Sequence, residues 1–195
     1  MTSSNSLDRR EAVARLLQNR NDLMVITGLG TATYDAMAAG DDDLNFYLWG
    51  AMGSAAMIGF GLAMAQPERP VLVLTGDGEM LMGLGSLATI GIKKPGNLSI
   101  VVLDNEHYGE TGMQPSHTNS EIRLDEVACA CGFEWTEAIR DMTSVELLRN
   151  RIHETSQTCF ATIKINADEP PRVLAPRDGV YVKNRFRARL GLTSL

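Results

Sequence analysis

Two oxygen-bearing side chains, Asp77 and Asn105, stand where they can share one divalent cation. Asp77 lies in a Gly-Asp-Gly turn, 76–78, directly after the apolar run 71–74, which is typical of a strand buried on both faces. A glycine-rich turn between a strand and a helix points backbone N–H groups at one spot, which suits a phosphate. A carboxylate beside a phosphate requires a cation between them, and oxygen ligands favour Mg²⁺ or Ca²⁺ over zinc.

Asn105 comes directly after a second buried run, residues 98–104, which predicts another strand of the same sheet. Since the carboxyl ends of neighbouring parallel strands lie side by side, the Asp77 carboxylate and the Asn105 amide are expected to bind a single ion. The alternative for these residues alone is that the triplet forms an ordinary turn and that Asn105 only ends a strand.

A longer pattern surrounds these residues. The triplet at 76–78, 26 intervening residues and Asn105 resemble the thiamine diphosphate signature of thiamine-dependent 2-oxo acid decarboxylases and acetolactate synthases. Residues 49–55 (WGAMGSA) are similar to the loop that holds the cofactor's aminopyrimidine ring, and residues 104–115 (DNEHYGETGMQP) resemble the metal-binding segment of sulfopyruvate and phosphonopyruvate decarboxylases. The resemblance covers roughly residues 20–165, and the length and layout are similar to those of small (beta) subunits of sulfopyruvate decarboxylase.

The resemblance implies how the diphosphate is held. Gly76 belongs to the binding turn, and the backbone N–H groups of Gly78 and Glu79 are expected to donate to the diphosphate. A second glycine-rich turn, 27–31, follows another expected strand, and in this family the matching turn supplies a hydroxyl, here that of Thr31. For the residues alone, the glycines of that turn can equally reflect tight turn geometry.

The resemblance also implies a magnesium site. The side chains of Asp77 and Asn105 and the backbone carbonyl of His107 are expected to bind Mg²⁺, and two diphosphate oxygens and one water would complete six-fold coordination. Tyr108 and Gly109 follow directly and are expected to contact the cofactor.

Gly50 and Met52 are the residues that the resemblance assigns to the cofactor's bent shape. The backbone carbonyl of Gly50 would accept a hydrogen bond from the 4′-amino group, and the side chain of Met52 would support the two rings from below. Methionine is large, flexible and apolar, so it can fill such a bend. The alternative is that Met52 is one more core methionine among the ten of the chain.

His107 and Glu110 are the remaining candidates for a catalytic role. The imidazole of His107 is a candidate acid or base, although the family uses its carbonyl, and Glu110 lies near the place where related enzymes have substrate-facing groups. The chain departs from the sulfopyruvate and phosphonopyruvate enzymes at Glu106, His107 and Met113, where smaller residues are expected. This departure leaves the substrate open.

The elements that must position these residues alternate between strand and helix. Strands are expected over residues 23–26, 44–48, 71–74, 98–104, 133–136 and 159–165. Helices are expected over residues 7–19, 32–39, 54–65, 80–92, 124–131 and 143–156. This alternation predicts an α/β fold, a doubly wound open parallel sheet with helices on both faces and a ligand at the carboxyl ends of the strands.

Composition narrows the class of protein. The chain has 195 residues, which favours a single domain, and its net charge of −6 argues against general nucleic-acid binding. No run of 18 apolar residues predicts a membrane span, and the polar first residues resemble neither a signal peptide nor a transit peptide. The three cysteines have no metal-ligand spacing and are expected to be reduced, as in a cytoplasmic protein.

The C-terminal segment differs in composition from the rest. We expect residues 1–168 to form the diphosphate-binding (PP) domain and residues 169–195 to form a basic tail, in which six basic residues and one acidic residue follow position 171. This tail can dock on a partner subunit, or one of its arginines can bind the sulfonate, phosphonate or carboxylate of a substrate. A solvated tail is the remaining alternative.

The resemblance implies a missing half. Enzymes of this family need a glutamate from a separate pyrimidine-binding (PYR) domain to activate the cofactor, and no glutamate of this chain lies in a matching context. An alpha subunit with a PYR domain would supply it, so the active site would lie between subunits of a higher heteromer, and the chain alone would be inactive.

The expected function is the decarboxylation of an anionic 2-oxo acid, such as 3-sulfopyruvate or phosphonopyruvate, to an aldehyde and CO₂. One alternative is a carboligase or C–C lyase subunit that uses the same cofactor. Another is a catalytically silent cofactor-binding module. A nicotinamide-binding module is disfavoured because position 33 is threonine, where the dinucleotide fingerprint needs a third glycine.

Overall fold

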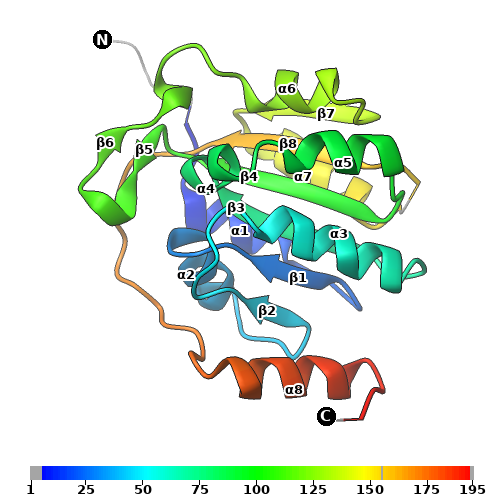
Figure 1. Ribbon diagram of the computed structural model, residues 1–195. Coiled ribbons are helices and arrows are strands. Elements are labelled where there is room, and N and C mark those ends of the chain that lie inside the picture. The colour runs from blue at the N-terminus through cyan, green and yellow to red at the C-terminus, as the bar shows by residue number, and fades with distance from the viewer. Residues whose placement is uncertain (1–5, 155, 194–195) are drawn as a thin grey trace.

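The computed structural model describes residues 6–154 and 156–193. Its centre is a six-stranded parallel sheet in the order β2-β1-β3-β4-β8-β7 (Figure 1). In that order, the strands are Asn45–Tyr47, Met24–Thr27, Val71–Gly76, Leu98–Asp104, Cys159–Lys164 and Trp135–Ile139.

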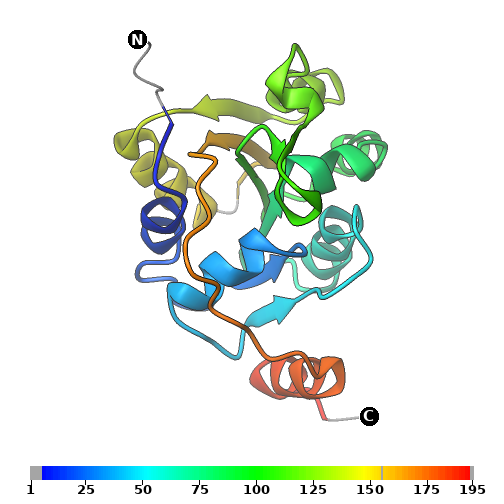
Figure 2. The ribbon, with the colours of Figure 1, turned by 90° about the vertical axis from the view of Figure 1, so that its left-hand side faces the viewer.

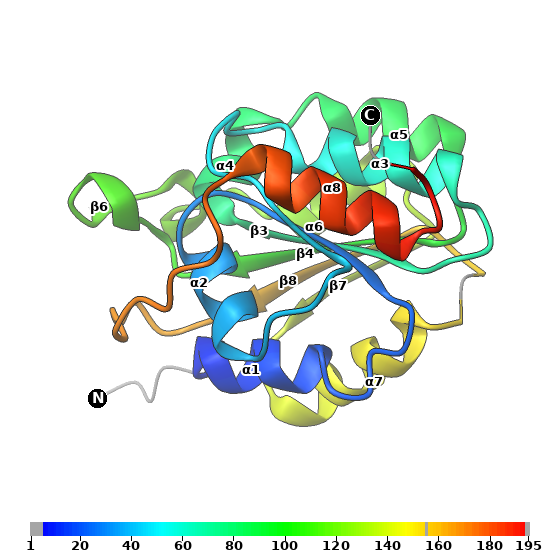
Figure 3. The ribbon, with the colours of Figure 1, turned by 90° about the horizontal axis from the view of Figure 1, so that it is seen from below.

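Helices cover both faces of this sheet, as Figure 3 shows from below. One face packs against Arg9–Leu16 (α1), Thr31–Ala38 (α2) and Met142–Ile152 (α7). The other packs against Ala55–Ala65 (α3), Asp77–Met82 (α4), Ser86–Lys93 (α5) and Leu124–Ala130 (α6). The doubly wound parallel α/β fold predicted from the sequence is confirmed.

Strand β3 shows why its sequence is apolar at consecutive positions. Leu72 and Leu74 pack into the hydrophobic cluster on one face, and Val71 and Val73 pack into the cluster on the other. All four side chains are fully buried, and burial of each contributes about 1.5–3 kcal/mol. This double packing fixes the place where the strand ends, and therefore the place of the turn that follows it.

The prediction of a single helix over residues 80–92 is wrong. The chain forms two helices there, α4 and α5, with a break at 83–85. The loop before α3 passes very close to this break. A Cβ atom added at Gly83 would lie 2.1 Å from the carbonyl oxygen of Gly53. The glycine therefore permits a backbone contact that no helix-period pattern could reveal.

Several other boundaries differ from prediction. Helices α1 and α7 are shorter than expected, and the side chains of Asp8 and Asp141 cap their N-termini by accepting hydrogen bonds from backbone N–H groups three residues later. The strand predicted over 133–136 begins at Trp135, where pairing with β8 begins. Phe133 instead packs edge-on against Phe160.

A small hairpin follows β4 and leads the chain over the carboxyl ends of the strands. His107–Tyr108 (β5) and Gln114–Pro115 (β6) pair antiparallel, and the short 3₁₀ helix Gly109–Thr111 (η1) joins them. A second 3₁₀ helix, His117–Asn119 (η2), comes directly after the hairpin. This segment brings side chains from positions 105–118 next to the turn after β3.

The basic C-terminal segment contains a helix that the sequence analysis did not predict. Gly179–Arg189 (α8) lies beside β2 at the edge of the sheet, and its Phe186 packs edge-on against Phe46 with ring centroids 5.8 Å apart. The segment before α8 runs past α2 and the carboxyl ends of the strands (Figure 2). Among the helices that the structure describes, none is long and apolar enough to cross a membrane.

Candidate active site

Four connections at the carboxyl ends of β1, β2, β3 and β4 surround one pocket. Its lining residues are Leu29, Thr31, Met52, Gly76, Gly78, Glu79, Asn105, Tyr108, Gly109, Glu110 and Thr111. Nine of these were expected at the site from the sequence. Asp77 lies buried at the start of α4 beside the pocket, whereas Gly50 and His107 are not among the residues that line it.

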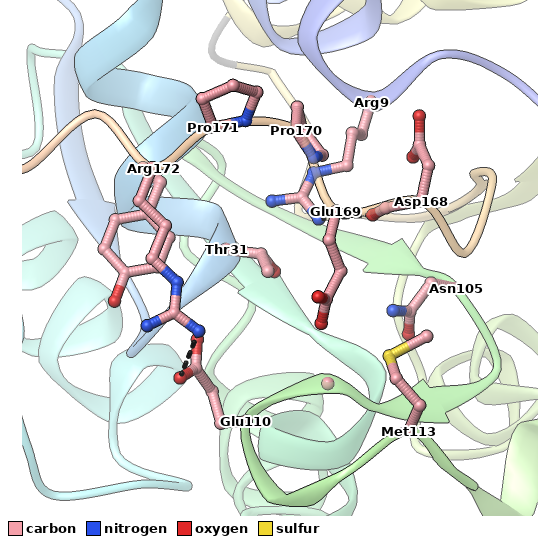
Figure 4. A pocket seen from close by; sticks show the side chains of 12 residues that line it. Arg9, Thr31, Asn105, Glu110, Met113, Asp168, Glu169, Pro170, Pro171 and Arg172 are labelled. Carbon is pink, nitrogen blue, oxygen red and sulfur yellow. Dashed lines mark hydrogen bonds and ion pairs between the residues drawn. The ribbon is translucent and has the colours of Figure 1, made fainter.

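Figure 4 shows a second pocket, which shares Thr31, Asn105, Gly109 and Glu110 with the first. The segment Asp168 to Arg172 forms its outer wall, and Arg172 lies 3.6 Å from a carboxylate oxygen of Glu110. The same guanidinium stacks over the ring of Tyr34, 5.5 Å from its centroid. The basic segment therefore reaches the rim of the candidate site.

Asp77 is the first residue of α4, where the helix dipole favours a negative charge. Its side chain is buried, and Oδ2 accepts a hydrogen bond from the hydroxyl of Ser116 and lies 3.1 Å from the hydroxyl of Thr118. Burial raises the pKa of Asp77, the nearby Asp104 raises it further, and the two hydroxyls act in the opposite direction. Among the described residues, Asp77 has no cationic partner.

Thr118 connects Asp77 to a buried charge cluster behind it. Its hydroxyl is 2.7 Å from Oδ1 of Asp104, and the ammonium of Lys164 lies 2.6 Å from Oδ2 of Asp104 and 2.7 Å from Glu106. Ser116, Thr118 and Lys164 were not expected at the site from the sequence. One signal was present: Lys164 ends an otherwise uncharged buried strand, and it pairs in register with Asp104.

The turn after β4 bends at Glu106, directly after Asn105. Glu106 has a left-handed backbone with φ of 64°, which is uncommon for a residue other than glycine. Oδ1 of Asn105 accepts a hydrogen bond of 3.0 Å from the backbone N–H of His107, and Nδ1 of that imidazole lies 2.7 Å from the Asn105 carbonyl oxygen. The imidazole is turned back onto its own chain.

Tyr108 packs against the turn after β3 and accounts for the glycine there. A Cβ atom added at Gly78 would lie 2.7 Å from the ring of Tyr108. The tyrosine hydroxyl is 2.7 Å from Nδ1 of His117, at the start of η2. The hairpin is thereby held over the Gly-Asp-Gly turn.

Met52 projects from a strained loop. Ala51 and Gly53, on either side of it, both have left-handed backbones, with φ of 55° and 85°. The Met52 side chain is 43% exposed and lines the pocket, so the alternative that it is a core methionine is wrong. Gly50 is exposed, and a Cβ added there would meet nothing within 4 Å.

Glu79 has a buried side chain, although the sequence predicted a role only for its backbone N–H. The hydroxyl of Thr75 lies 3.0 Å from its Oε2. Burial raises the pKa of the Glu79 carboxyl, while Thr75 and the backbone amides of Gly53, Leu29 and Ala55 act to lower it. Oε1 has no hydrogen-bond partner of good geometry among the described residues.

Comparison with known proteins identifies the class. Residues 27–161 match the family of the C-terminal TPP binding domain of thiamine pyrophosphate (thiamine diphosphate) enzymes, and the chain belongs to this family. It is 37% identical to the sulfopyruvate decarboxylase subunit beta of Methanococcus maripaludis over 92% of this chain and 96% of the relative. It is 42% identical to the phosphonopyruvate decarboxylase of Streptomyces viridochromogenes over 74% of this chain.

The chain spans only 35% of that phosphonopyruvate decarboxylase. The crystal structure of benzoylformate decarboxylase from Polynucleobacter necessarius superposes with a TM-score of 0.69 at 17% identity, covering 85% of this chain and 34% of that one. The fold is therefore that of thiamine diphosphate-dependent enzymes, in which a domain of this kind makes up a part of a longer chain.

The residues at the site fit a magnesium-bound diphosphate. Asp77 is a buried carboxylate beside a second acid, and a divalent cation would supply the countercharge that the described residues do not. Both hydroxyls contact its Oδ2, and no hydrogen bond from another described residue occupies Oδ1. No group of three or more His, Cys, Asp or Glu that could hold a metal occurs in the described part of the chain. The Asn105 amide, which lines the pocket, offers an oxygen of the kind that Mg²⁺ accepts.

Proposed function

We propose that this chain is the thiamine diphosphate- and Mg²⁺-binding subunit of a two-subunit decarboxylase that acts on an anionic 2-oxo acid. The observation that carries this proposal is the buried Asp77 carboxylate, which lies without a countercharge among the described residues at the edge of a pocket built from four strand ends. The family match and the names of the relatives support the same assignment.

Each residue has a definite task in this proposal. Asp77, Asn105 and the carbonyl of His107 hold the cation. The hydroxyl of Thr31 and the N–H groups at 76–79, at the N-termini of α2 and α4, face the diphosphate, where backbone donors and helix dipoles favour an anion.

The bound thiamine diphosphate would accept the electron pair that is released when CO₂ leaves the substrate. Met52 would support the cofactor rings from the exposed tip of its loop, and the carbonyl of Gly50 would orient the 4′-amino group. Tyr108 and Gly109 would close the diphosphate side of the pocket. Glu110 lines both pockets and would face the substrate.

The partner in this proposal is an alpha subunit whose PYR domain supplies an activating glutamate. The Methanococcus maripaludis relative, which matches over nearly its whole length, is named a beta subunit. The phosphonopyruvate decarboxylase, whose name mentions no subunit, is about three times as long as its matched segment. The site would lie between subunits, with at least two copies of each chain. The free thiols of Cys129, Cys131 and Cys159 agree with a reducing cytoplasm.

Charge at the rim supports this substrate class. A sulfonate or phosphonate needs a positively charged donor. Arg172 lines the second pocket, where its exposed guanidinium lies 3.6 Å from the carboxylate of Glu110. Both 3-sulfopyruvate and phosphonopyruvate carry such a group. The sulfopyruvate and phosphonopyruvate decarboxylases among the relatives support this choice.

The test is to co-express this chain with the chain encoded beside it and to measure CO₂ release from a panel of 2-oxo acids. We expect release from an anionic three-carbon acid, dependent on thiamine diphosphate and Mg²⁺, and none from this chain alone. A free aldehyde identifies the decarboxylase, whereas a coupled hydroxyketone identifies a carboligase. Turnover by the purified lone chain would contradict the need for a partner.

A further inference from the structure

The side chain of Glu79 contacts three separate connections of the site. Its Oε2 accepts the hydrogen bond from Thr75 at the end of β3. The backbone N–H groups of Leu29, in the turn after β1, of Gly53, in the loop after β2, and of Ala55, at the start of α3, act to lower the pKa that burial raises. These connections also carry Thr31, Met52 and the Gly-Asp-Gly turn.

The N-terminus of α3 lacks a side-chain cap of its own. Ser54 occupies the N-cap position but makes no capping hydrogen bond, so the first N–H groups of this 11-residue helix need another acceptor. The Glu79 carboxylate lies near the backbone N–H of Ala55, the first residue of this helix, and complements the positive end of the helix dipole. Glu79 of α4 thus places a negative charge at the start of α3, which the N-cap serine does not supply.

Gly28 shows how closely the carboxylate fits. A Cβ atom added at Gly28 would lie 1.6 Å from Oε2 of Glu79, so any larger residue there would displace the carboxylate. Its backbone N–H bonds to the carbonyl of Leu74 in β3 at 2.8 Å, which keeps the turn against the neighbouring strand. The glycine in the first turn and the glutamate in α4 therefore form a matched pair.

Stability alone does not account for a carboxylate at this place. Glu79 is 4% exposed, and moving an ionised group out of water is costly unless specific donors compensate it. An apolar side chain of similar size would fill the same volume without that cost. The carboxylate accepts the hydrogen bond of Thr75 and also places a negative charge beside backbone N–H groups of two other connections.

We propose that Glu79 is a positioning residue that fixes the three cofactor-binding connections relative to one another before the cofactor binds. It acts through Thr31, Met52 and the Gly-Asp-Gly turn rather than on the reacting atoms. The proposal rests on the proposed function, because it takes this pocket as the thiamine diphosphate site.

The experiment compares the two-subunit enzyme with its Glu79→Gln and Thr75→Val variants, and uses Glu68→Ala, at an exposed position, as control. Titration calorimetry gives the Kd of thiamine diphosphate at saturating Mg²⁺, and thermal unfolding gives the stability of the cofactor-free complex. Glu79→Gln removes the buried charge but keeps the side chain's size. We expect the Kd of this variant for thiamine diphosphate to rise about tenfold, as is typical when a residue that orients binding groups is changed. The unfolding midpoint of the cofactor-free complex should be unchanged or higher.

A Kd within twofold of the control, or a weaker affinity that merely parallels a lower unfolding midpoint, would overturn the proposal. Thr75→Val should shift Kd in the same direction by a smaller factor, since it removes one donor only. If the unaltered enzyme fails to bind thiamine diphosphate, the proposed function fails instead, so the two failures are distinguishable.

A double-mutant cycle tests directly whether Gly28 and Glu79 act as a pair. Gly28→Ala should weaken cofactor binding when Glu79 is present, because the new methyl group displaces the carboxylate. In a Glu79→Ala background the same change should cost little, since the space is free. Independent, additive losses would show that Gly28 does not act through Glu79 and would contradict the proposal.

Discussion

The two sides of the candidate site are held in different ways. Behind Asp77, the polar contacts are buried: Thr118, Asp104 and Lys164 are each less than 10% exposed and lie within 2.6–3.1 Å of their partners. At the rim, the Arg172 side chain is 60% exposed and lies 3.6 Å from Glu110. The first region is built to keep one geometry, and the second is free to change partners.

This difference assigns the two regions different tasks. Truncating one member of a buried charged network leaves its neighbours unpaired and is costly, whereas an exposed ion pair contributes about 0–1 kcal/mol. We therefore expect the buried side to determine whether the cofactor binds at all. The rim should determine which substrate is preferred, with little effect on stability.

The largest expected effect follows substitution of Asp77 in the buried region. Asp77→Asn keeps the shape but removes the charge that the cation needs, so the affinity for Mg²⁺ and thiamine diphosphate should fall by about 100-fold or more. Because burial raises the pKa of Asp77, the neutral amide should leave the stability of the cofactor-free protein unchanged or higher. Calorimetry and thermal unfolding measure both quantities, and cofactor binding at normal affinity would refute the site.

The next effect concerns the hydroxyl behind Asp77. Thr118→Val removes, at nearly constant volume, the hydroxyl that lies 3.1 Å from Asp77 and 2.7 Å from Asp104, and should weaken Mg²⁺ binding by about 10–100-fold. Thr89→Val, at an exposed position on α5, is the matched control. Equal metal affinities of the two variants would show that the buried network does not orient Asp77.

A smaller, more selective effect is expected at the rim. Arg172→Ala should raise KM for a substrate with a sulfonate or phosphonate about tenfold, the usual value of one charged hydrogen bond, while KM for a 2-oxo acid with an uncharged side chain stays constant. The free energy of unfolding should change by less than about 1 kcal/mol. An equal KM change for both substrates would remove Arg172 from substrate selection.

The smallest effect is expected from alkylation of the cysteines at the opposite end of the sheet, which should leave activity unchanged. Burial raises the pKa of the Cys159 thiol to about 11, so little thiolate is present near neutral pH, whereas Cys129 is exposed. Iodoacetamide at pH 8 should therefore label Cys129 and leave Cys159 unmodified, as peptide mass spectrometry would show. Rapid labelling of Cys159 in the folded protein would show that the amino end of β8 opens readily.

The sequence was informative where a feature is local. The apolar run at 71–74 predicted a doubly buried strand, and the residues around Asp77, Asn105 and Met52 predicted a family that the comparison confirms. These features depend on neighbours in the chain or on a spacing that the family repeats. The sites of the cofactor and the metal remain predictions.

Features that depend on distant contacts were missed. Ser116 bonds to a carboxylate 39 positions earlier, and Lys164 pairs with an acid 60 positions earlier. The break between α4 and α5 depends on the backbone of Gly53, and the Glu79 side chain lies against Gly28, 51 positions earlier. Local periodicity carries no information about such pairings, because tertiary packing alone creates them.

The most direct test of the central claim is a crystal structure of the two-subunit enzyme with Mg²⁺ and thiamine diphosphate. We predict a cation that bridges the diphosphate to the side-chain oxygens of Asp77 and Asn105 and the carbonyl of His107, at about 2.1 Å from each. A diphosphate bound elsewhere, with Asp77 bonded only to Ser116 and Thr118, would contradict the account.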